Sequence, residues 1–293
     1  MDGPARLEFV DGAVDGPLRG VIGSMVGYRA TGAMPSLHRG VPSPSLTLIV
    51  NLDTPIVVGE HAGALADGSA RAYENILGSL HVRPAYVFQP SRQAGIQLAL
   101  HPLAARRLVG VPVRELSDLS TDAADVLGEG IRLLQERIAD QAGWPQRFAT
   151  VERYLLDRAG RAPSVAPARP EVSAAWRWMV ANRGRGRMDD LARHVLLSGR
   201  QLTRVFRAEF GVTPKAVNRL IRFDRARRIV QSRVLAGRAV RLADIAQETG
   251  YFDHAHLVRE FHGFLGCSPT DWLAEEVGNI QAGGHRHGED LRS

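Results

Sequence analysis

The chain of 293 residues contains a single cysteine, Cys267, and a single lysine, Lys215. One thiol excludes an internal disulfide and a cysteine metal cluster, so Cys267 is expected to serve packing rather than chemistry. No run of about 18 apolar residues occurs, which predicts no membrane span. The N-terminal sequence lacks the basic-then-apolar pattern of a signal peptide. These absences together predict a soluble, cytoplasmic protein with no membrane partner.

Positive charge is concentrated in the C-terminal third. Residues 171–272 contain 18 Lys and Arg against 10 Asp and Glu, a balance of +8, whereas the whole chain has a net charge of +6. The remainder is therefore slightly acidic. A localised basic surface is typical of nucleic-acid binding, although a solvated helix face is the simpler explanation for an isolated run of charge. The length favours two domains.

The same segment contains one motif twice, from Met188 to Lys215 and from Leu242 to Trp272. Two copies are too few for a solenoid, so we interpret them as a duplicated unit. The matched positions are Leu191-Ala192 with Ile245-Ala246 at an offset of 54, and Leu202, Arg204, Phe206, Gly211 and Pro214 with Leu257, Arg259, Phe261, Gly266 and Pro269 at an offset of 55.

Each copy predicts a helix, a turn and a second helix. In the first copy, Ser198 and Gln201 form a capping-box pattern, and Gly211 follows the expected helix end. In the second copy, Asp253 is the expected N-cap and Gly266 the end. Apolar stripes mark the buried faces of the two second helices: Leu202, Val205 and Phe206 in one, Leu257, Phe261 and Phe264 in the other.

A long helix is predicted between the copies, from Thr213-Pro214 to about Gly237. Roughly 20 residues at 1.5 Å each span about 30 Å. Adjacent major-groove faces of a duplex lie about 34 Å apart. A rigid helix of this length would therefore hold both units against one side of the DNA.

This segment resembles the DNA-binding domain of the AraC/XylS family of bacterial transcription regulators, over about 100 of the 293 residues. It departs from the family pattern at Leu257, where phenylalanine is common, and at Ala255, which cannot donate a hydrogen bond as the aligned Arg200 can. The positions that carry the resemblance are Leu191-Ala192, Ser198, Leu202, Arg204, Phe206, Gly211 to Pro214, Arg222, Ala226, Asp244 to Ala246, Gly250-Tyr251, Asp253, His256-Leu257, Arg259, Phe261 and Gly266 to Pro269.

The resemblance implies an effector-responsive regulator, commonly an activator, whose two units read adjacent major grooves. It implies double-stranded DNA, a small-molecule effector, RNA polymerase and a second copy of the chain as partners, with a location on the bacterial nucleoid. The predicted base contacts are Arg200, Thr203, Arg204, His254, His256 and Arg259; the predicted phosphate contacts are Ser198, Arg207, Lys215 and Arg222.

Residues 1–118 predict a mostly β domain, a sandwich or a barrel, so the fold class is α+β. The spacing of Leu18, Ile22, Met25 and Val26 predicts a short first helix. In the family this position usually holds a sensor domain, often a cupin-like barrel. The predicted strands are Leu46 to Val50, Ile56 to Val58, Leu80 to Val82, Ala85 to Phe88 and Ile96 to Leu100, followed by a short helix from Pro102 to Val109.

Four histidines, His38, His61, His81 and His101, raise the question of a metal site. None belongs to a close His-x-His pair, so we expect no metal and no cofactor. His38, Arg39 and Arg83 are weak candidates for an anionic effector site, with a surface role as the alternative.

A helical connector is predicted over residues 119–158. Its first helix is expected to be capped by Ser120 or Thr121 and to run to about Gln141; its second follows Trp144-Pro145. The narrow stripe of Leu127, Ile131, Leu134 and Ile138 favours dimerisation, the alternative being that the helices cover the β domain. The remaining predicted divisions are a linker at 159–170, a DNA-binding domain at 171–275 and a disordered tail at 276–293.

Two other classes of function compete with a regulator. A cupin-type enzyme tethered to DNA, or an alkyl-transfer repair protein, would need a catalytic constellation, and no nucleophile with its base or paired carboxylates stands out. We therefore expect no enzyme. A non-specific nucleoid-binding protein would need no sensor domain, and its distinguishing property would be the lack of sequence preference on DNA.

Overall fold

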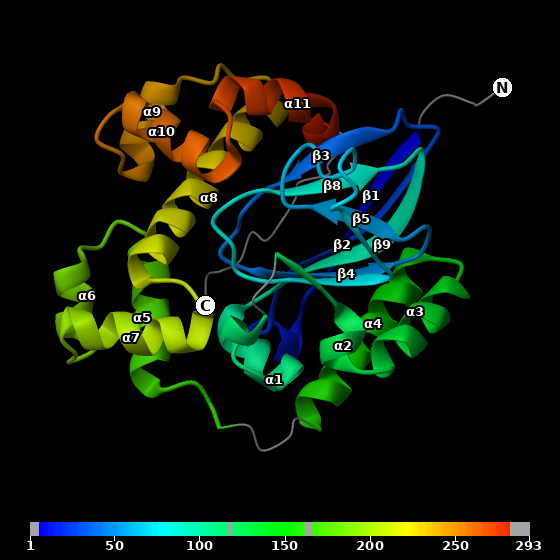
Figure 1. The fold of residues 1–293 in the computed structure, drawn as a ribbon, viewed down its shortest axis with the longest axis horizontal. Coiled ribbons are helices and arrows are strands. Elements are labelled where there is room, and N and C mark those ends of the chain that lie inside the picture. The colour runs from blue at the N-terminus through cyan, green and yellow to red at the C-terminus, as the bar shows by residue number, and fades with distance from the viewer. Residues whose placement is uncertain (1–5, 117–118, 162–165, 282–293) are drawn as a thin grey trace.

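The computed structural model describes residues 6–116, 119–161 and 166–281, and its N-terminal half is built from two antiparallel sheets (Figure 1). The larger sheet has the order β1 (Arg6–Gly12), β2 (Ile22–Thr31), β9 (Arg92–Leu100), β4 (Leu46–Asn51), β7 (Asn75–Gly78), β10 (Ser120–Asp122). The smaller sheet has the order β3 (Ser36–Gly40), β8 (Ala85–Gln89), β5 (Ile56–Gly59), β6 (Arg71–Tyr73). The predicted β domain is confirmed.

Two local predictions in this domain are wrong. The residues from Ile22 to Val26 begin strand β2 instead of continuing a helix, and only Gly16–Leu18 form a 3-10 turn. Strand β2 is covered on both faces, so its apolar residues do not alternate with polar ones and mimic helical spacing. Leu80 to Val82 are not a strand, because β7 has already ended at Gly78.

Short helices cover one face of the larger sheet: α1 (Ala105–Val109), α2 (Ala123–Leu127), α3 (Gly130–Ala139) and α4 (Trp144–Gly160). The single helix predicted from Ser120 or Thr121 to Gln141 is wrong. Residues 120–122 form β10, and Asp122 caps α2 by accepting a hydrogen bond from the N–H of Ala124 at 2.8 Å. Gly128, with φ of +72°, then separates α2 from α3.

The alternating strands bury both of their faces. Leu46, Leu48 and Val50 pack into the core beneath α3 and α4, as Leu98 does in β9. The residues that alternate with these apolar ones, such as Gln97 in β9, face the smaller sheet across a cavity. The polar half of the pattern therefore marks an interior surface.

The C-terminal half is helical and confirms the two predicted helix-turn-helix units (Figure 1). The capping box of Ser198 and Gln201 is present, Asp253 caps its helix, and Gly211 and Gly266 both adopt left-handed φ values. The helices are α5 (Pro170–Ala181), α6 (Met188–His194), α7 (Gly199–Phe210), α8 (Pro214–Leu235), α9 (Leu242–Thr249), α10 (His254–Leu265) and α11 (Pro269–Gln281).

Helix α11 corrects part of the predicted tail. Residues 276–281, expected to be disordered, belong to this helix, whereas 282–293 lie outside the described residues. Among the helices described, none is long and apolar enough to cross a bilayer.

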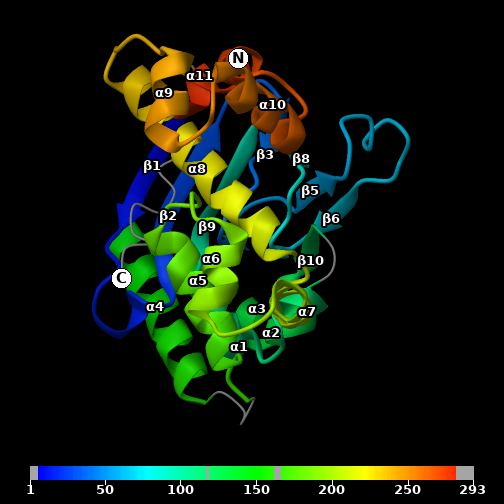
Figure 2. The ribbon, with the colours of Figure 1, turned by 90° about the vertical axis from the view of Figure 1, so that its left-hand side faces the viewer.

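The two units differ in how they are anchored. The core of the first unit is continuous with that of the β domain, and Trp176 of α5 stacks on Phe206 of α7 with ring centroids 6.2 Å apart. The second unit has its own core, in which Phe223 of α8 packs against Phe261 and Phe264 of α10. Helix α8 contributes residues to both cores, and it runs between the two units (Figure 2).

Candidate nucleic-acid interface and effector cavity

Helix α7 presents three guanidinium groups on one exposed face. Its capping box fixes the first turn, and its opposite face buries Leu202 and Phe206. Arg200, Arg204 and Arg207 are exposed, and none forms an ion pair within the described part of the chain. Together with Thr203 they line a shallow groove. This is the arrangement that a recognition helix requires.

Helix α10 presents fewer hydrogen-bond donors on its exposed face than α7 does. His254 and Arg259 are exposed, and Arg259 has no ion pair with a described residue. The His256 ring lies edge-on to Tyr251 at 5.1 Å, and its Nδ1 accepts a hydrogen bond from the N–H of Phe252 at 3.5 Å. With Ala255 at the position of Arg200, this unit offers fewer donors than the first.

The predicted phosphate contacts have different surroundings. Lys215 is exposed in the first turn of α8, and the Ser198 hydroxyl accepts a hydrogen bond from the N–H of Gln201 at 3.2 Å at the start of α7. Arg222 is half-buried, and its guanidinium lies 4.7 Å from the centroid of the Tyr251 ring. Arg222 thus joins α8 to the second unit.

Polar contacts fix the two units relative to each other. The guanidinium of Arg219 on α8 lies 3.0 Å from a carboxylate oxygen of Glu260 on α10. Arg185, in the loop between α5 and α6, donates to the carbonyl oxygen of Glu248 at the end of α9. The second unit is therefore held from both α8 and the loop that precedes the first unit.

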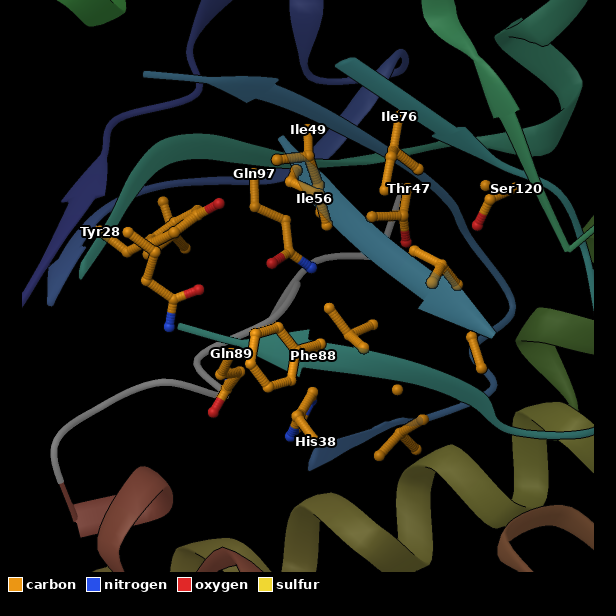
Figure 3. Close-up of a pocket in the computed structure, with 18 of the residues that line it drawn as sticks. Tyr28, His38, Thr47, Ile49, Ile56, Ile76, Phe88, Gln89, Gln97 and Ser120 are labelled. Carbon is orange, nitrogen blue, oxygen red and sulfur yellow. The ribbon is translucent and has the colours of Figure 1, made fainter. Parts of the chain in front are cut away.

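A cavity of about 450 Å³ lies between the two sheets (Figure 3). Tyr28, Thr47 and Gln97 point into it from the larger sheet, and His38 and Gln89 point into it from the smaller one. Its volume lies within the roughly 300–1,000 Å³ typical of small-molecule sites. The cavity is thus large enough to hold an effector.

The cavity reaches the DNA-binding half of the molecule. Asp224, Arg227 and Arg228 of α8 and Glu275 of α11 contribute to its wall. Although burial raises the pKa of Asp224, the charges of Arg228 and Arg227 lower it below its usual range. The carboxylate is thereby held ionised between two guanidinium groups, at 2.8 Å from each.

Two arginine–glutamate pairs connect the halves of the molecule. Arg106 donates two hydrogen bonds to Glu209 of α7, at 2.7 and 2.8 Å. Arg39 donates two to Glu275 of α11, at 3.0 and 3.1 Å, and one to the carbonyl oxygen of Leu265 at 2.7 Å. Each helix-turn-helix unit is therefore tied to the β domain by an arginine–glutamate pair.

The weak candidates for an anionic effector site are not brought together. His38 lines the cavity, with Nδ1 2.9 Å from a carboxylate oxygen of Glu276. Arg39 serves the tie to α11 just described, and Arg83 pairs with Glu60 at the surface at 2.7 Å. Among these three, only His38 contributes to the cavity.

The four histidines considered for a metal lie in separate environments. His61 lies 3.3 Å from Asp67 at the surface, and His81 contacts the carbonyl oxygen of Arg83 at 2.6 Å. His101 accepts a hydrogen bond from the N–H of Leu103 at 3.2 Å. Within residues 6–116, 119–161 and 166–281, no group of three His, Cys, Asp or Glu has a geometry suited to a metal ion.

The sequence interpretation missed Tyr28, Gln93 and Gln97 as cavity residues. The sequence pattern predicts the strand from Ile96 to Leu100 but gives its polar residues no role. The predicted connector helices could have indicated this arrangement. If helices cover the apolar face of a sheet, its polar face can still lie against a second sheet and enclose a cavity.

The comparisons with known proteins agree with this architecture. A family model described as a helix-turn-helix domain matches residues 191–275. No curated protein matches the chain. Among solved structures, an apo variant of ToxT from Vibrio cholerae is 10% identical, with a TM-score of 0.51, over 85% of this chain and 97% of that one.

Two further solved structures are similar to parts or all of the chain. Wild-type ToxT from Vibrio cholerae bound to an unsaturated fatty acid is 11% identical, with a TM-score of 0.47, over 93% of this chain and 96% of that one. A regulator with an AraC-type DNA-binding domain from Chromobacterium violaceum is 25% identical, with a TM-score of 0.32, over 36% of this chain and 91% of that one. The family match makes the C-terminal part of the chain a helix-turn-helix domain, and it supports a DNA-binding transcription regulator.

Proposed function

We propose that the protein is an effector-responsive regulator that places α7 and α10 in two adjacent major grooves. The observation that carries this proposal is the exposed face of α7, where Arg200, Arg204 and Arg207 have no ion pair within the described chain. The guanidinium group of arginine forms bidentate hydrogen bonds with guanine edges and with phosphates. DNA therefore supplies the hydrogen-bond acceptors that this face of α7 needs.

The roles of the individual residues follow from their positions. Arg200, Thr203 and Arg204 contact bases from the first unit, and His254, His256 and Arg259 contact bases from the second. Ser198, Arg207 and Lys215 contact phosphates. Because Arg222 is stacked on Tyr251, we assign it to the junction between the units, with any phosphate contact secondary.

The cavity between the sheets serves as the effector site. Helix α8 forms part of its wall and also joins the two units, so a ligand there contacts the element that sets their geometry. The response is allosteric if the ligand binds one arrangement of the two DNA-binding units more tightly than another.

We further propose a cytoplasmic homodimer on the bacterial nucleoid that activates transcription through RNA polymerase. The apolar faces of α3 and α4 are occupied by the β domain, which leaves Leu133 and Leu156 as the apolar residues open to a second copy. They are 47% and 41% exposed, respectively.

The test is selection of genomic fragments by the purified protein, followed by footprinting of the enriched fragments. We expect two protected patches about one helical turn apart. Arg204→Ala should relax preference in one patch and Arg259→Ala in the other, each at a cost of about 1–3 kcal/mol. Arg137→Ala on α3, an exposed arginine without an ion pair in the described chain, is the matched control and should change neither.

A different pattern would refute the proposal. Binding that enriches no sequence, and that weakens equally for all fragments as salt rises, is the behaviour of a non-specific DNA coat. Loss of binding in the Arg137→Ala control would show that total charge, rather than the faces of α7 and α10, determines recognition.

A further inference from the structure

One row of paired residues on the inner face of the larger sheet has a polar side chain between apolar ones. Gln97 of β9 is paired with Val26 of β2 on one side and with Ile49 of β4 on the other. Ile49 in turn is paired with Ile76 of β7. All four residues line the cavity, so the Gln97 amide has apolar neighbours along this row. Figure 3 shows it beside Ile49.

Two neutral groups flank this amide. The Tyr28 ring lies over Gly95, where an added Cβ would come within 2.7 Å of the hydroxyl oxygen, so glycine makes room for the ring. Thr47 lies two residues before Ile49 on the same face of β4. The side chains of Gln97, Tyr28 and Thr47 form no hydrogen bond with any described residue and face the same space.

Unused hydrogen-bonding groups in an interior carry a cost unless water or a ligand satisfies them. Tyr28 offers a neutral donor, because burial and then the negative charge of Asp53 raise the pKa of its hydroxyl. Burial also lowers the pKa of His81, another lining residue, which keeps that ring uncharged at neutral pH. The interior thus offers neutral donors and acceptors.

The charged groups of the wall are already compensated. Where the cavity meets α8 and α11, Arg227 and Arg228 both pair with Asp224 at 2.8 Å. Glu275 pairs with Arg39, which is not itself a wall residue, and His38 lies 2.9 Å from Glu276. Arg29 also contributes to the wall, but its guanidinium lies 5.9 Å from the centroid of the Trp144 ring on α4. An anionic ligand would therefore have to displace an existing partner to find a counter-charge.

We propose that the effector is an uncharged amphiphile with an apolar body and an amide, hydroxyl or carbonyl group that hydrogen-bonds to Gln97, Tyr28 and Thr47. This inference rests on the effector site of the proposed function and specifies its ligand class. A carboxylate is disfavoured, because burial of an ion without a partner costs far more than burial of a hydrogen-bonded neutral group.

The experiment compares three probes with one alkyl chain, namely decanamide, decanol and decanoic acid, by calorimetric titration of the full-length protein at pH 7.5. We expect decanamide and decanol to bind at least about tenfold more tightly than decanoic acid. The acid is ionised at this pH, and the described residues of the cavity wall offer its carboxylate no unpaired cation. A preference for the acid overturns the proposal, and so does the failure of both uncharged probes to bind.

The variants test whether Gln97 reads the polar group. Gln97→Leu should weaken decanamide binding roughly fivefold, the value of one net hydrogen bond. Gln146→Leu makes the same change at an exposed position of α4 and should leave binding unchanged. Thr47→Val, which keeps the shape of the side chain, provides a second test if Gln97→Leu fails to fold. Equal binding of the wild type and both cavity variants contradicts the assignment.

Failure of this inference is distinguishable from failure of the proposed function. The footprint on selected DNA is measured without ligand and depends on α7 and α10. A specific footprint with the wrong ligand preference removes only the uncharged class. Absence of a specific footprint removes the regulator itself, whatever binds in the cavity.

Discussion

At the scale of single residues, His101 links the stability of the protein to pH. Its ring lies edge-on to Trp176 of α5, with centroids 6.0 Å apart, and burial lowers its pKa from 6.5 to about 4. The folded state therefore holds the neutral ring, while the unfolded chain takes up a proton as pH falls below 6.5. The stabilisation is present above pH 6.5 and is lost as pH falls to about 4.

We predict that His101→Asn removes this dependence. The asparagine oxygen can still accept the hydrogen bond from the N–H of Leu103. Between pH 7.5 and pH 4, the stability of the wild type should fall relative to the variant by roughly 2–3 kcal/mol, at about 1.4 kcal/mol per pKa unit. Urea unfolding at several pH values measures this difference. Parallel stability curves for the two proteins would show that His101 is not buried in its neutral form.

At the scale of elements, Gly250 ends α9 in a conformation that other residues rarely adopt. Its φ is +81°, and an added Cβ would come within 2.6 Å of the Arg185 guanidinium, which contacts the end of this helix. We predict that Gly250→Ala destabilises the protein by about 1–2 kcal/mol from the left-handed conformation alone. It should also loosen the contact that orients the second unit.

Gly263→Ala in α10 is the matched control. Gly263 has no positive φ, and an added Cβ would meet only the Arg219 guanidinium at 3.7 Å, an ordinary contact. This change should stabilise the helix by about 0.5–1 kcal/mol. Thermal unfolding of both variants checks the prediction, and shifts of the same sign would contradict it.

The same elements show what the sequence could predict. Caps and stops such as Ser198, Asp253, Gly211 and Gly266 act within a few residues, so they located the helices of both units. Strand β2 was predicted as a helix because the residues that cover it are far away in the sequence. Trp144 lies over Gly27, where an added Cβ would come within 2.4 Å of the indole. A strand covered in this way has no polar face to reveal it.

At the scale of the whole molecule, the contacts between the halves were beyond sequence reasoning. Arg39 and Glu275 are separated by 236 residues, and Arg106 and Glu209 by 103. No local pattern connects such positions, because only the folded β domain brings them together. The cavity has the same origin, since its wall combines two sheets with α8 and α11.

The two ties are alike in chemistry but differ in burial, and this difference predicts unequal energies. The Glu209 side chain is 7% exposed and that of Glu275 is 45% exposed. Arg106→Met leaves Glu209 buried without its partner and should destabilise the protein by about 3 kcal/mol. Glu275→Gln breaks a pair that water already screens and should cost about 1 kcal/mol or less.

A double variant separates the cost of an orphaned charge from the worth of the pair. Arg106→Met combined with Glu209→Leu removes both charges and should recover most of the stability that Arg106→Met loses. Urea unfolding of the full chain measures the stability of Arg106→Met, Glu275→Gln and the double variant. If the double variant is no more stable than Arg106→Met, the guanidinium and carboxylate contribute net stability to the contact between the β domain and α7. The first recognition helix would then owe its position to the ion pair, whereas recovery in the double variant assigns that position to the apolar core that Trp176 and Phe206 share with the β domain.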